Sequence, residues 1–328
     1  MPLLIIFSLI IALFVIVIIY KTIEKPSRRD GRLNHNLVID ETIELEYQKQ
    51  IRREIIAKVV RYVIAYSLLT VAAFLVVFPF YWMFATSVKS AEEVMKMPPT
   101  IFPHEIHIEN FKVAMQSANF GRFLINTLIV GVFSTLGTLV TTVTSAFAFA
   151  RLNFRGRDLL FSMFIATMMI PGEMMVITNF ITIMEWGMYN TYAAMIIPFW
   201  VSTYYIYLLR NTFKQIPNEL YYAAKVDGTS DFKYLLKVML PIASPTIITI
   251  TILKLMGAWN SYVWPNLITD EDMRLITNGL RGSFSSEDGA TVHLQMAATT
   301  VVTVPLLLVF IFFRKYIMRG VSRSGIKG

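Results

Sequence analysis

The sequence predicts an all-α fold, a bundle of helices that crosses a membrane several times. Hydrophobic residues make up 55% of the 328-residue chain, charged residues make up only 16%, and the mean hydropathy is +0.56. This balance is typical of integral membrane proteins. Seven apolar stretches also approach or exceed the roughly 20 residues that a helix needs to cross the hydrocarbon. They are residues 2–20, 62–84, 123–150, 159–184, 192–209, 242–264 and 293–313.

The basic residues are unevenly distributed over the connections between these stretches. Most Lys and Arg residues lie in residues 21–61, 151–158, 210–237 and 314–328, whereas residues 85–121, 185–191 and 265–292 carry few. Because connections rich in Lys and Arg stay in the cytoplasm, the pattern predicts a multi-pass protein of the plasma membrane with a cytoplasmic C-terminus. It also accounts for the net charge of +8 without a nucleic-acid partner.

The N-terminal part precedes the main membrane domain. Residues 2–20 are predicted to be a retained anchor span rather than a signal peptide, because no basic residue precedes the apolar run and no A-x-A-like site follows it. Residues 21–61 form a charged cytoplasmic linker, and residues 41–58 within it are predicted to be helical. A solvated linker and a regulatory or partner-binding arm both remain open. Residues 62–328 form the main domain.

Two further elements of that domain have clear local signals. Residues 109–117, in an external segment broken by prolines, are predicted to form a short helix that lies on the membrane. Residues 123–150 are rich in Gly, Ala, Ser and Thr. Small residues let helices approach closely in lipid, and hydroxyl groups bond across helices. This span is therefore predicted to be buried in the bundle.

Two charged side chains fall inside predicted spans. Glu173 follows Pro171 and Gly172 at the centre of residues 159–184. Breaks of this kind in a membrane helix are tolerated only where protein or water repairs the backbone. A carboxylate at this depth should face a cavity or a polar partner. Lys254, in the middle of residues 242–264, is a candidate partner for Glu173.

Residues 217–245 form a polar insert between two spans. Pro217 fits the first position of a helix, and Glu219 lies in its first turn, where the helix dipole favours an anion. The pair Asp227-Gly228 is predicted to end this helix. A second helix over residues 232–240 can be capped by Thr229, Ser230 or Asp231, and Pro241 and Pro245 are predicted to mark the return into lipid. On pattern alone, the insert is either a docking element or an ordinary cytoplasmic loop.

The residues of the insert resemble the EAA loop of ABC importer permeases. The resemblance is carried by Glu219, Ala223, Ala224, Asp227, Gly228, Phe232, Leu240, Pro241 and Pro245. In that family the loop is the coupling helix that sits in a groove of the ATPase subunit. The resemblance therefore implies coupling roles for Glu219, Tyr222, Ala223, Ala224, Asp227, Gly228 and Pro241. Tyr222 departs from the family pattern, which has Glu there, so the family-type salt bridge from this position is absent.

Two other runs resemble the carbohydrate branch of these permeases, the maltose-type and MalG-like proteins. One is Trp259-Asn260 followed by Trp264-Pro265, and the other is the tail RKYIMRGVSRSGIKG at residues 314–328. The resemblance covers about residues 62–328 and implies a MetI-like core of six spans, to which residues 2–20 add a seventh. It implies the permease subunit of an ATP-driven bacterial importer for carbohydrate, with an oligosaccharide favoured, that works by alternating access.

The same resemblance implies the partners: a second permease, a dimer of ABC ATPase subunits and an extracellular solute-binding protein. The chain has no G-x-x-x-x-G-K-[ST] phosphate loop, no G-x-S-x-G elbow and no metal-spaced His cluster. We therefore expect no enzyme activity, metal or cofactor on this chain, and ATP and Mg²⁺ on the ATPase. His104 and His107, three residues apart, are weak metal candidates.

Carbohydrates are held by aromatic faces and by amides or carboxylates that bond hydroxyl groups. On this basis the candidate substrate pathway comprises Glu173, Asn179, Trp200, Tyr204, Trp259 and Asn260. Each has a structural alternative: Glu173 can pair with Lys254 or cap the backbone freed by Pro171, and the tryptophans can be interfacial anchors. The second permease can also hold most of the sugar.

Three other readings of the whole chain stay open. An ion-coupled secondary transporter is disfavoured, because only Glu173 and Lys254 lie deep in predicted spans and proton relays usually need several ionisable groups. Such a transporter also gives no reason for the docking insert. An ABC permease for a non-sugar solute differs only in its cargo, and a membrane scaffold without transport is weaker still.

Overall fold

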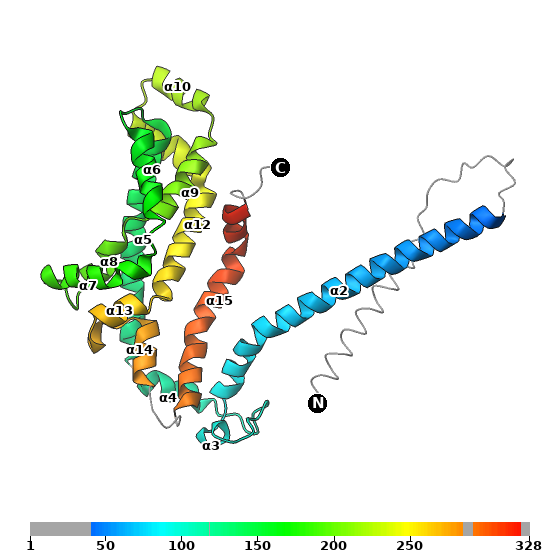
Figure 1. Ribbon diagram of the computed structural model, residues 1–328. Coiled ribbons are helices and arrows are strands. Elements are labelled where there is room, and N and C mark those ends of the chain that lie inside the picture. The colour runs from blue at the N-terminus through cyan, green and yellow to red at the C-terminus, as the bar shows by residue number, and fades with distance from the viewer. Residues whose placement is uncertain (1–40, 118, 285–290, 323–328) are drawn as a thin grey trace. The chain divides into compact units, whose positions relative to one another are not determined.

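The computed structural model describes residues 41–117, 119–284 and 291–322 (Figure 1). All the regular elements within these residues are helices, so the predicted all-α fold is confirmed. The anchor span expected at residues 2–20 and the first part of the linker lie outside the described residues. The chain divides into two compact units, Met1–Trp82 and Met83–Gly328.

The described part of the first unit belongs to one long helix. Helix α2 (Glu41–Ser87) contains 47 residues and unites the expected linker helix with the expected span at residues 62–84. The prediction of two separate elements was wrong because nothing between them breaks a helix: α2 has no Gly, and its first Pro is Pro79. In its apolar part, aromatic rings pair one turn apart, as Tyr62 with Tyr66 and Phe74 with Phe78.

The second unit contains the other candidate spans. Two are single long helices, α5 (Phe120–Arg151) and α15 (Val292–Ser322), and a third is the helical run Asp231–Trp259. Two more are bent pairs. Helix α6 (Arg157–Thr167) meets η1 (Gly172–Met175) and α7 (Val176–Glu185) at 84°, and α8 (Tyr192–Ile196) with η2 (Ile197–Phe199) meets α9 (Thr203–Lys214) at 43°. Counted with α2, the described residues provide up to six spans, as the six-span core requires.

Helix α5 is the central element of the second unit. It packs against α9 and α12 (Leu240–Trp259), and buries hydroxyl side chains that include Thr127, Ser134 and Thr138. Gly137 is required for this packing, because a Cβ atom there would overlap the indole ring of Trp200. The prediction that this small-residue span is buried is confirmed.

The break between η2 and α9 is repaired by side chains from two neighbouring helices. The hydroxyl groups of Thr138 and Thr141 on α5 donate to the carbonyl oxygens of Phe199 and Trp200. The ammonium group of Lys254 on α12 donates to the same Phe199 oxygen at 2.9 Å. The carbonyl groups freed by the break are therefore satisfied inside the protein, which is the condition for irregular backbone within a membrane.

Helices α11 (Asp231–Tyr234), η3 (Leu235–Met239) and α12 form one continuous helical run. Pro241 and Pro245 lie inside this run, so the predicted end of the second helix at residue 240 was wrong, and the helix continues through both prolines. The element η3 is a wide π turn, closed by a bond from the Leu240 N–H to the Leu235 carbonyl. A proline ring clashes with the carbonyl four residues earlier, and a wider turn just before Pro241 relieves that clash.

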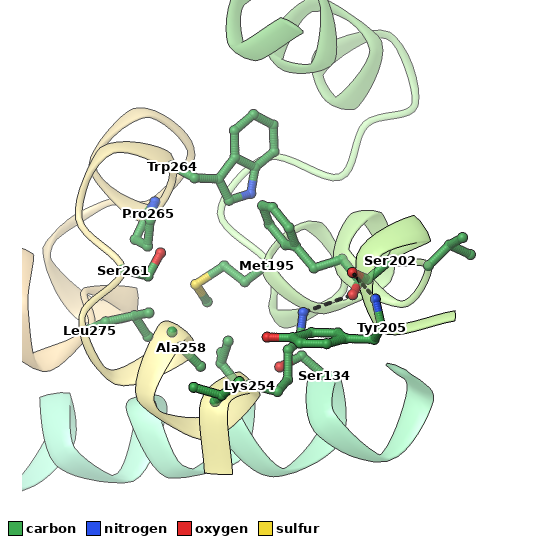
Figure 2. A pocket seen from close by; sticks show the side chains of 15 residues that line it. Ser134, Met195, Ser202, Tyr205, Lys254, Ala258, Ser261, Trp264, Pro265 and Leu275 are labelled. Carbon is green, nitrogen blue, oxygen red and sulfur yellow. Dashed lines mark hydrogen bonds between the residues drawn. The ribbon is translucent and has the colours of Figure 1, made fainter. Parts of the chain in front are cut away.

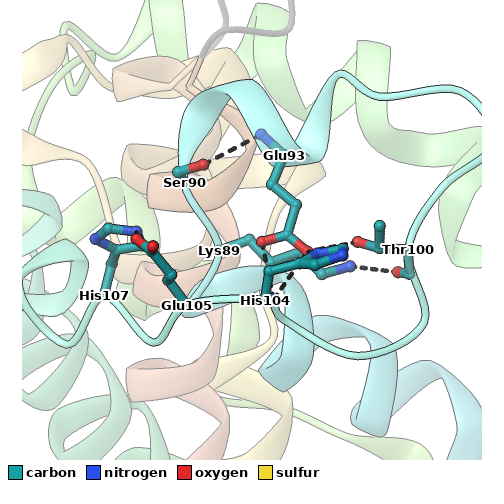
Figure 3. Close-up of polar contacts among 7 residues, drawn as sticks. All are labelled: Lys89, Ser90, Glu93, Thr100, His104, Glu105 and His107. Atoms are coloured by element: carbon teal, nitrogen blue, oxygen red, sulfur yellow. Dashed lines mark hydrogen bonds and ion pairs between the residues drawn. The ribbon is translucent and has the colours of Figure 1, made fainter.

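The segment before α5 is ordered around a buried carboxylate (Figure 3). Glu93, on α3 (Ala91–Val94), is only 5% exposed. Its oxygens accept hydrogen bonds from the Thr100 hydroxyl at 2.7 Å and the His104 backbone N–H at 3.2 Å, and the His104 ring lies 2.7 Å away. Burial alone would raise the pKa of Glu93, but the hydrogen bonds from His104 and Thr100 outweigh it, and this pKa is lowered. The carboxylate is therefore charged at neutral pH.

Helix α4 (Glu109–Ser117) has the bounds that the sequence predicted, but not the expected surroundings. Ala114 is fully buried and belongs to a cluster with Phe120, Ala297 and Ala298. The helix therefore packs against α15 rather than lying only on the membrane. In Figure 1, α4 lies at one end of the second unit, and α10 (Asn218–Val226) lies at the other.

Side chains at the start of α5 fix the connection that joins α12 to α15. The amide of Asn126 donates to the carbonyl oxygens of Asp272 and Arg274, and Thr127 accepts from the N–H of Ile276, the first residue of α14 (Ile276–Ser283). The same connection holds α13 (Val263–Ile268) and η4 (Glu271–Met273). Asn126 and Thr127 are thus buried structural residues at the start of α5.

Candidate functional site

The insert after α9 begins with a short, exposed helix. Helix α10 spans Asn218–Val226. Pro217, with a ψ of 139°, is the N-cap residue just before the helix, whereas the sequence predicted it at the first helical position. Gly228 has a φ of +69°, the left-handed conformation expected for the residue that ends this helix. The Ser230 hydroxyl then accepts from the Lys233 N–H at 3.4 Å and caps α11, which selects Ser230 from the three predicted caps.

One face of α10 is open to solvent and the other is packed. The open face includes Tyr222, which is 63% exposed, and Val226, which is 89% exposed, together with Glu219, Ala223 and Asp227. The packed face carries Tyr221 and Ala224, which lie against a buried cluster built from α5, α9 and the run 231–259. Exposed apolar side chains grouped on one face are a common feature of protein–protein interaction sites.

A small polar network fixes the turn between α10 and α11. Asp231 accepts hydrogen bonds from the Tyr221 hydroxyl and the Lys225 ammonium group, each at 2.8 Å. The hydrogen bond to Asp231 raises the pKa of Lys225, and burial together with the same partner raises the pKa of Tyr221. Both side chains therefore stay protonated at neutral pH, and the network joins α10 to the first residue of α11 across Gly228.

Arg151, the last residue of α5, connects the bundle to the base of α10. Its side chain is buried, and its guanidinium group donates to the carbonyl oxygens of Phe213, at 2.9 Å, and Ile216. A third bond reaches the side-chain oxygen of Asn218, the first residue of α10, at 2.6 Å. One side chain thus connects three elements: the end of α5, the end of α9 and the start of α10.

Arg151 was not predicted to be a functional residue from the sequence. The only signal was its position at the end of an apolar span, which was interpreted as part of the cytoplasmic positive charge. Nothing in the sequence shows that the carbonyl groups at the end of α9, more than sixty residues later, meet this guanidinium group.

A cavity of about 320 Å³ lies between α5, α12 and the broken span of η2 and α9 (Figure 2). Figure 2 shows Lys254 and Tyr205 reaching into it, and Ser134 and Ser261 on its walls. Apolar parts of the wall come from residues such as Met195, Trp264 and Leu275. Among the described residues that line this cavity, Lys254 alone carries a charge.

None of the six predicted pathway residues lines this cavity. Trp200, Tyr204, Trp259 and Asn260 are sequence neighbours of lining residues but lie outside the lining. Trp200 instead packs on Gly137 of α5, and Trp259 packs in the cluster around Phe120 and Ala297. Their roles in substrate binding stay predictions.

The other two pathway candidates, Glu173 and Asn179, lie on the bent segment of η1 and α7 with exposed side chains. The Glu173–Lys254 pair suggested by the sequence is not among the ion pairs of the described residues. Lys254 instead bonds the Phe199 carbonyl. The sequence pointed to the charge of Lys254, but its partner depends on how the broken span packs, which no local pattern encodes.

Comparison with known proteins places these features in context. Residues 141–323 match the model of a family described as "Binding-protein-dependent transport system inner membrane component". This match covers more than half of the chain.

Among curated proteins, the chain is 29% identical to the diacetylchitobiose uptake system permease protein NgcG of Streptomyces coelicolor, covering 80% of this chain and 87% of that protein. It is 27% identical to the sn-glycerol-3-phosphate transport system permease protein UgpE of Brucella abortus, covering 80% and 96%.

Among solved structures, a chain of a bacterial ABC transporter involved in the import of the acidic polysaccharide alginate is similar. Its TM-score is 0.71 at 24% identity, with 78% of this chain and 96% of that chain covered. A second structure, of a bacterial alginate ABC transporter with a periplasmic protein bound to an alginate pentasaccharide, gives a TM-score of 0.56 at 18% identity. At these identities the two structures establish a shared fold.

Proposed function

The chain belongs to the family of binding-protein-dependent transport system inner membrane components, and from this premise we propose that it moves a carbohydrate across the membrane as one permease subunit of an ATP-driven importer. Membership makes the chain a multi-pass permease of an ABC importer. The carbohydrate cargo, the division of labour between subunits and the roles of single residues are our proposals.

The observation that carries the coupling part of this proposal is the exposed helix α10. Its open face, with Glu219, Tyr222, Ala223 and Asp227, is free to enter a groove of an ATPase subunit. Its base is held by Arg151 and by the network around Asp231. A helix of nine residues is about 14 Å long, so it offers a compact surface that moves as one body with the spans behind it.

A carbohydrate is favoured as cargo by two observations. The curated relative NgcG is named for uptake of the disaccharide diacetylchitobiose. The run from Trp259-Asn260 to Trp264-Pro265 resembles the carbohydrate branch, and it lies at the end of α12 beside the cavity. A solute other than a sugar is the second candidate, because UgpE is named for sn-glycerol-3-phosphate.

We assign ATP and Mg²⁺ to a separate ATPase dimer, and the cavity to a pathway shared with a second permease. An external binding protein delivers the solute. ATP binding closes the ATPase dimer and displaces α10, and this displacement switches the bundle between inward-open and outward-open arrangements. In this proposal the chain hydrolyses no ATP, and it contributes the coupling helix and part of the wall of the pathway.

The decisive experiment measures ATP hydrolysis by the purified assembly of both permeases and the ATPase in lipid nanodiscs. We expect hydrolysis to rise several-fold when the binding protein is added with a saccharide that it binds. Binding protein without saccharide serves as the control. If hydrolysis never responds to any saccharide, but responds to another class of solute, the cargo assignment is wrong while the importer assignment stands.

The topology of the proposal makes a second prediction. The chain has no Cys, so a single Cys can be placed at Val226, on α10, or at Glu105, in the segment before α4. In intact cells, an impermeant maleimide is expected to label the Glu105→Cys variant and to spare Val226→Cys. Labelling of both in membranes stripped of the ATPase is the control for reactivity. Labelling of position 226 in intact cells would reverse the proposed orientation.

A further inference from the structure

We propose that the cavity beside Lys254 receives the anionic group of an acidic saccharide, a carboxylate or a phosphate. This inference rests on the proposed function and narrows the class of carbohydrate that the chain passes. It is carried by the charge of the lining, the unused donors of Lys254 and the polar groups arranged around it.

The lining combines one cation with several hydroxyl groups. Lys254 is the only charged residue among the fifteen described lining residues, and no carboxylate is among them. Ser134, Tyr205 and Ser261 place hydroxyl groups on the same walls, and Figure 2 shows their side chains around one space. A saccharide that bears an acidic group needs this combination of one positive charge and several hydroxyl partners.

The ammonium group of Lys254 has donors to spare. It carries three N–H groups, and one of them is used by the Phe199 carbonyl at 2.9 Å. Among the described residues, no Asp or Glu forms an ion pair with Lys254. A half-buried cation in an apolar helix is costly unless a negative group compensates it, and such groups mark substrate or ion pathways. An anionic solute supplies this compensation when it enters.

Lys254 also has a structural task that must be separated from recognition. The Phe199 oxygen that accepts from Lys254 accepts from the Thr138 hydroxyl at 2.9 Å as well. Repair of the break between η2 and α9 therefore does not depend on Lys254 alone. It also needs only an N–H donor, whereas recognition of an anion needs the positive charge.

The substitution Lys254→Gln exploits this difference, because glutamine keeps an N–H donor and removes the charge. Lys254→Arg keeps both. A matched control is Lys237→Gln, which makes the same chemical change on the same helical run but outside the cavity lining. All three variants are produced as the full assembly, with the second permease, the ATPase and the binding protein.

Uptake into proteoliposomes and stimulated ATP hydrolysis are then measured with four probes. Tetragalacturonate carries carboxylates, glucose 6-phosphate carries a phosphate, and cellotetraose and diacetylchitobiose are neutral. We expect the wild type to respond to an acidic probe, and Lys254→Gln to reduce uptake of that probe by about tenfold or more. Lys254→Arg and Lys237→Gln should stay within about threefold of the wild type. The carboxylate and phosphate probes distinguish the two kinds of acidic group.

Two results would overturn the inference. One is a wild-type assembly that transports a neutral saccharide and neither acidic probe. The other is transport of an acidic probe that Lys254→Gln leaves unchanged, which would restrict Lys254 to repair of the break. If no saccharide of either charge is transported while another solute is, the proposed carbohydrate function fails instead, so the two failures are distinguishable.

Discussion

Replacing Gly228 by valine is expected to abolish transport while the membrane bundle still folds. Gly228 adopts a φ of +69°, and a Cβ atom placed there would meet nothing within 4 Å. The damage therefore comes from backbone strain, about 1–2 kcal/mol in the left-handed region, and not from a clash. The turn relieves this strain by changing the angle between α10 and α11, which removes α10 from its docking position.

The measurement compares three quantities for Gly228→Val: the amount of protein in the membrane, the ATPase subunit that co-purifies with it, and solute uptake. We expect the first to be near normal and the other two to fall by at least about tenfold. Gly228→Asn is the matched control, because asparagine tolerates the left-handed region better than valine. Wild-type uptake by the valine variant would show that this turn does not position the coupling helix.

Replacing Arg151 by methionine is expected to uncouple ATP hydrolysis from transport. Methionine fills part of the space but leaves the Ile216 carbonyl without its guanidinium donor, and it removes one donor from the Phe213 carbonyl, which keeps the Ile216 N–H. An orphaned buried carbonyl costs about 1–3 kcal/mol, so the end of α9 and the start of α10 loosen. The ATPase can still bind the exposed face of α10. However, the loosened base of α10 lets this helix move without moving the membrane spans.

The readout for Arg151→Met is the ratio of solute transported to ATP hydrolysed, which we expect to fall by about tenfold. A merely structural defect would lower both activities together and leave the ratio unchanged. Arg151→Lys should keep an intermediate ratio, because lysine provides charge and donors without the planar fork. Arg155→Met, in the exposed turn that follows α5, is the matched control and should behave as wild type.

The sequence predicted those elements that have local signals. The bounds of α4, the end of α10 at Gly228 and the burial of the hydroxyl-rich helix α5 all follow from residue types within a few positions. The predicted helix boundaries were wrong in two situations: where no helix-breaking residue is present, and where the helix continues through a proline. Helix α2 has no breaker at residues 58–62, and the π turn before Pro241 lets the helix continue through a proline.

The candidate site was less predictable because its contacts join distant residues. Lys254 meets the Phe199 carbonyl, fifty-five residues earlier, and Arg151 meets the Ile216 carbonyl, sixty-five residues later. Both acceptors are backbone carbonyl groups exposed by a break or by a helix end. Every residue has such a carbonyl group, so the residue type does not show which one will act as an acceptor. A charge in a span therefore revealed that a partner was needed but suggested the wrong one, Glu173.

In the proposed mechanism, the continuous helical run Asp231–Trp259 transmits the displacement of α10 to the cavity wall. Its 29 residues make a rod about 44 Å long, anchored at one end beside α10 and carrying Lys254 near the other. A rod that pivots near its middle swings its two ends in opposite directions by equal amounts, so a push of about 2 Å at the coupling end returns about 2 Å at the cavity wall. If two separate helices were joined by a loop, the loop would bend and less of this displacement would reach the cavity wall. The π turn and Pro241 lie on the coupling side of the middle, and Pro245 lies at the middle itself. These features lower the bending stiffness of the rod and limit how much of the displacement reaches the cavity.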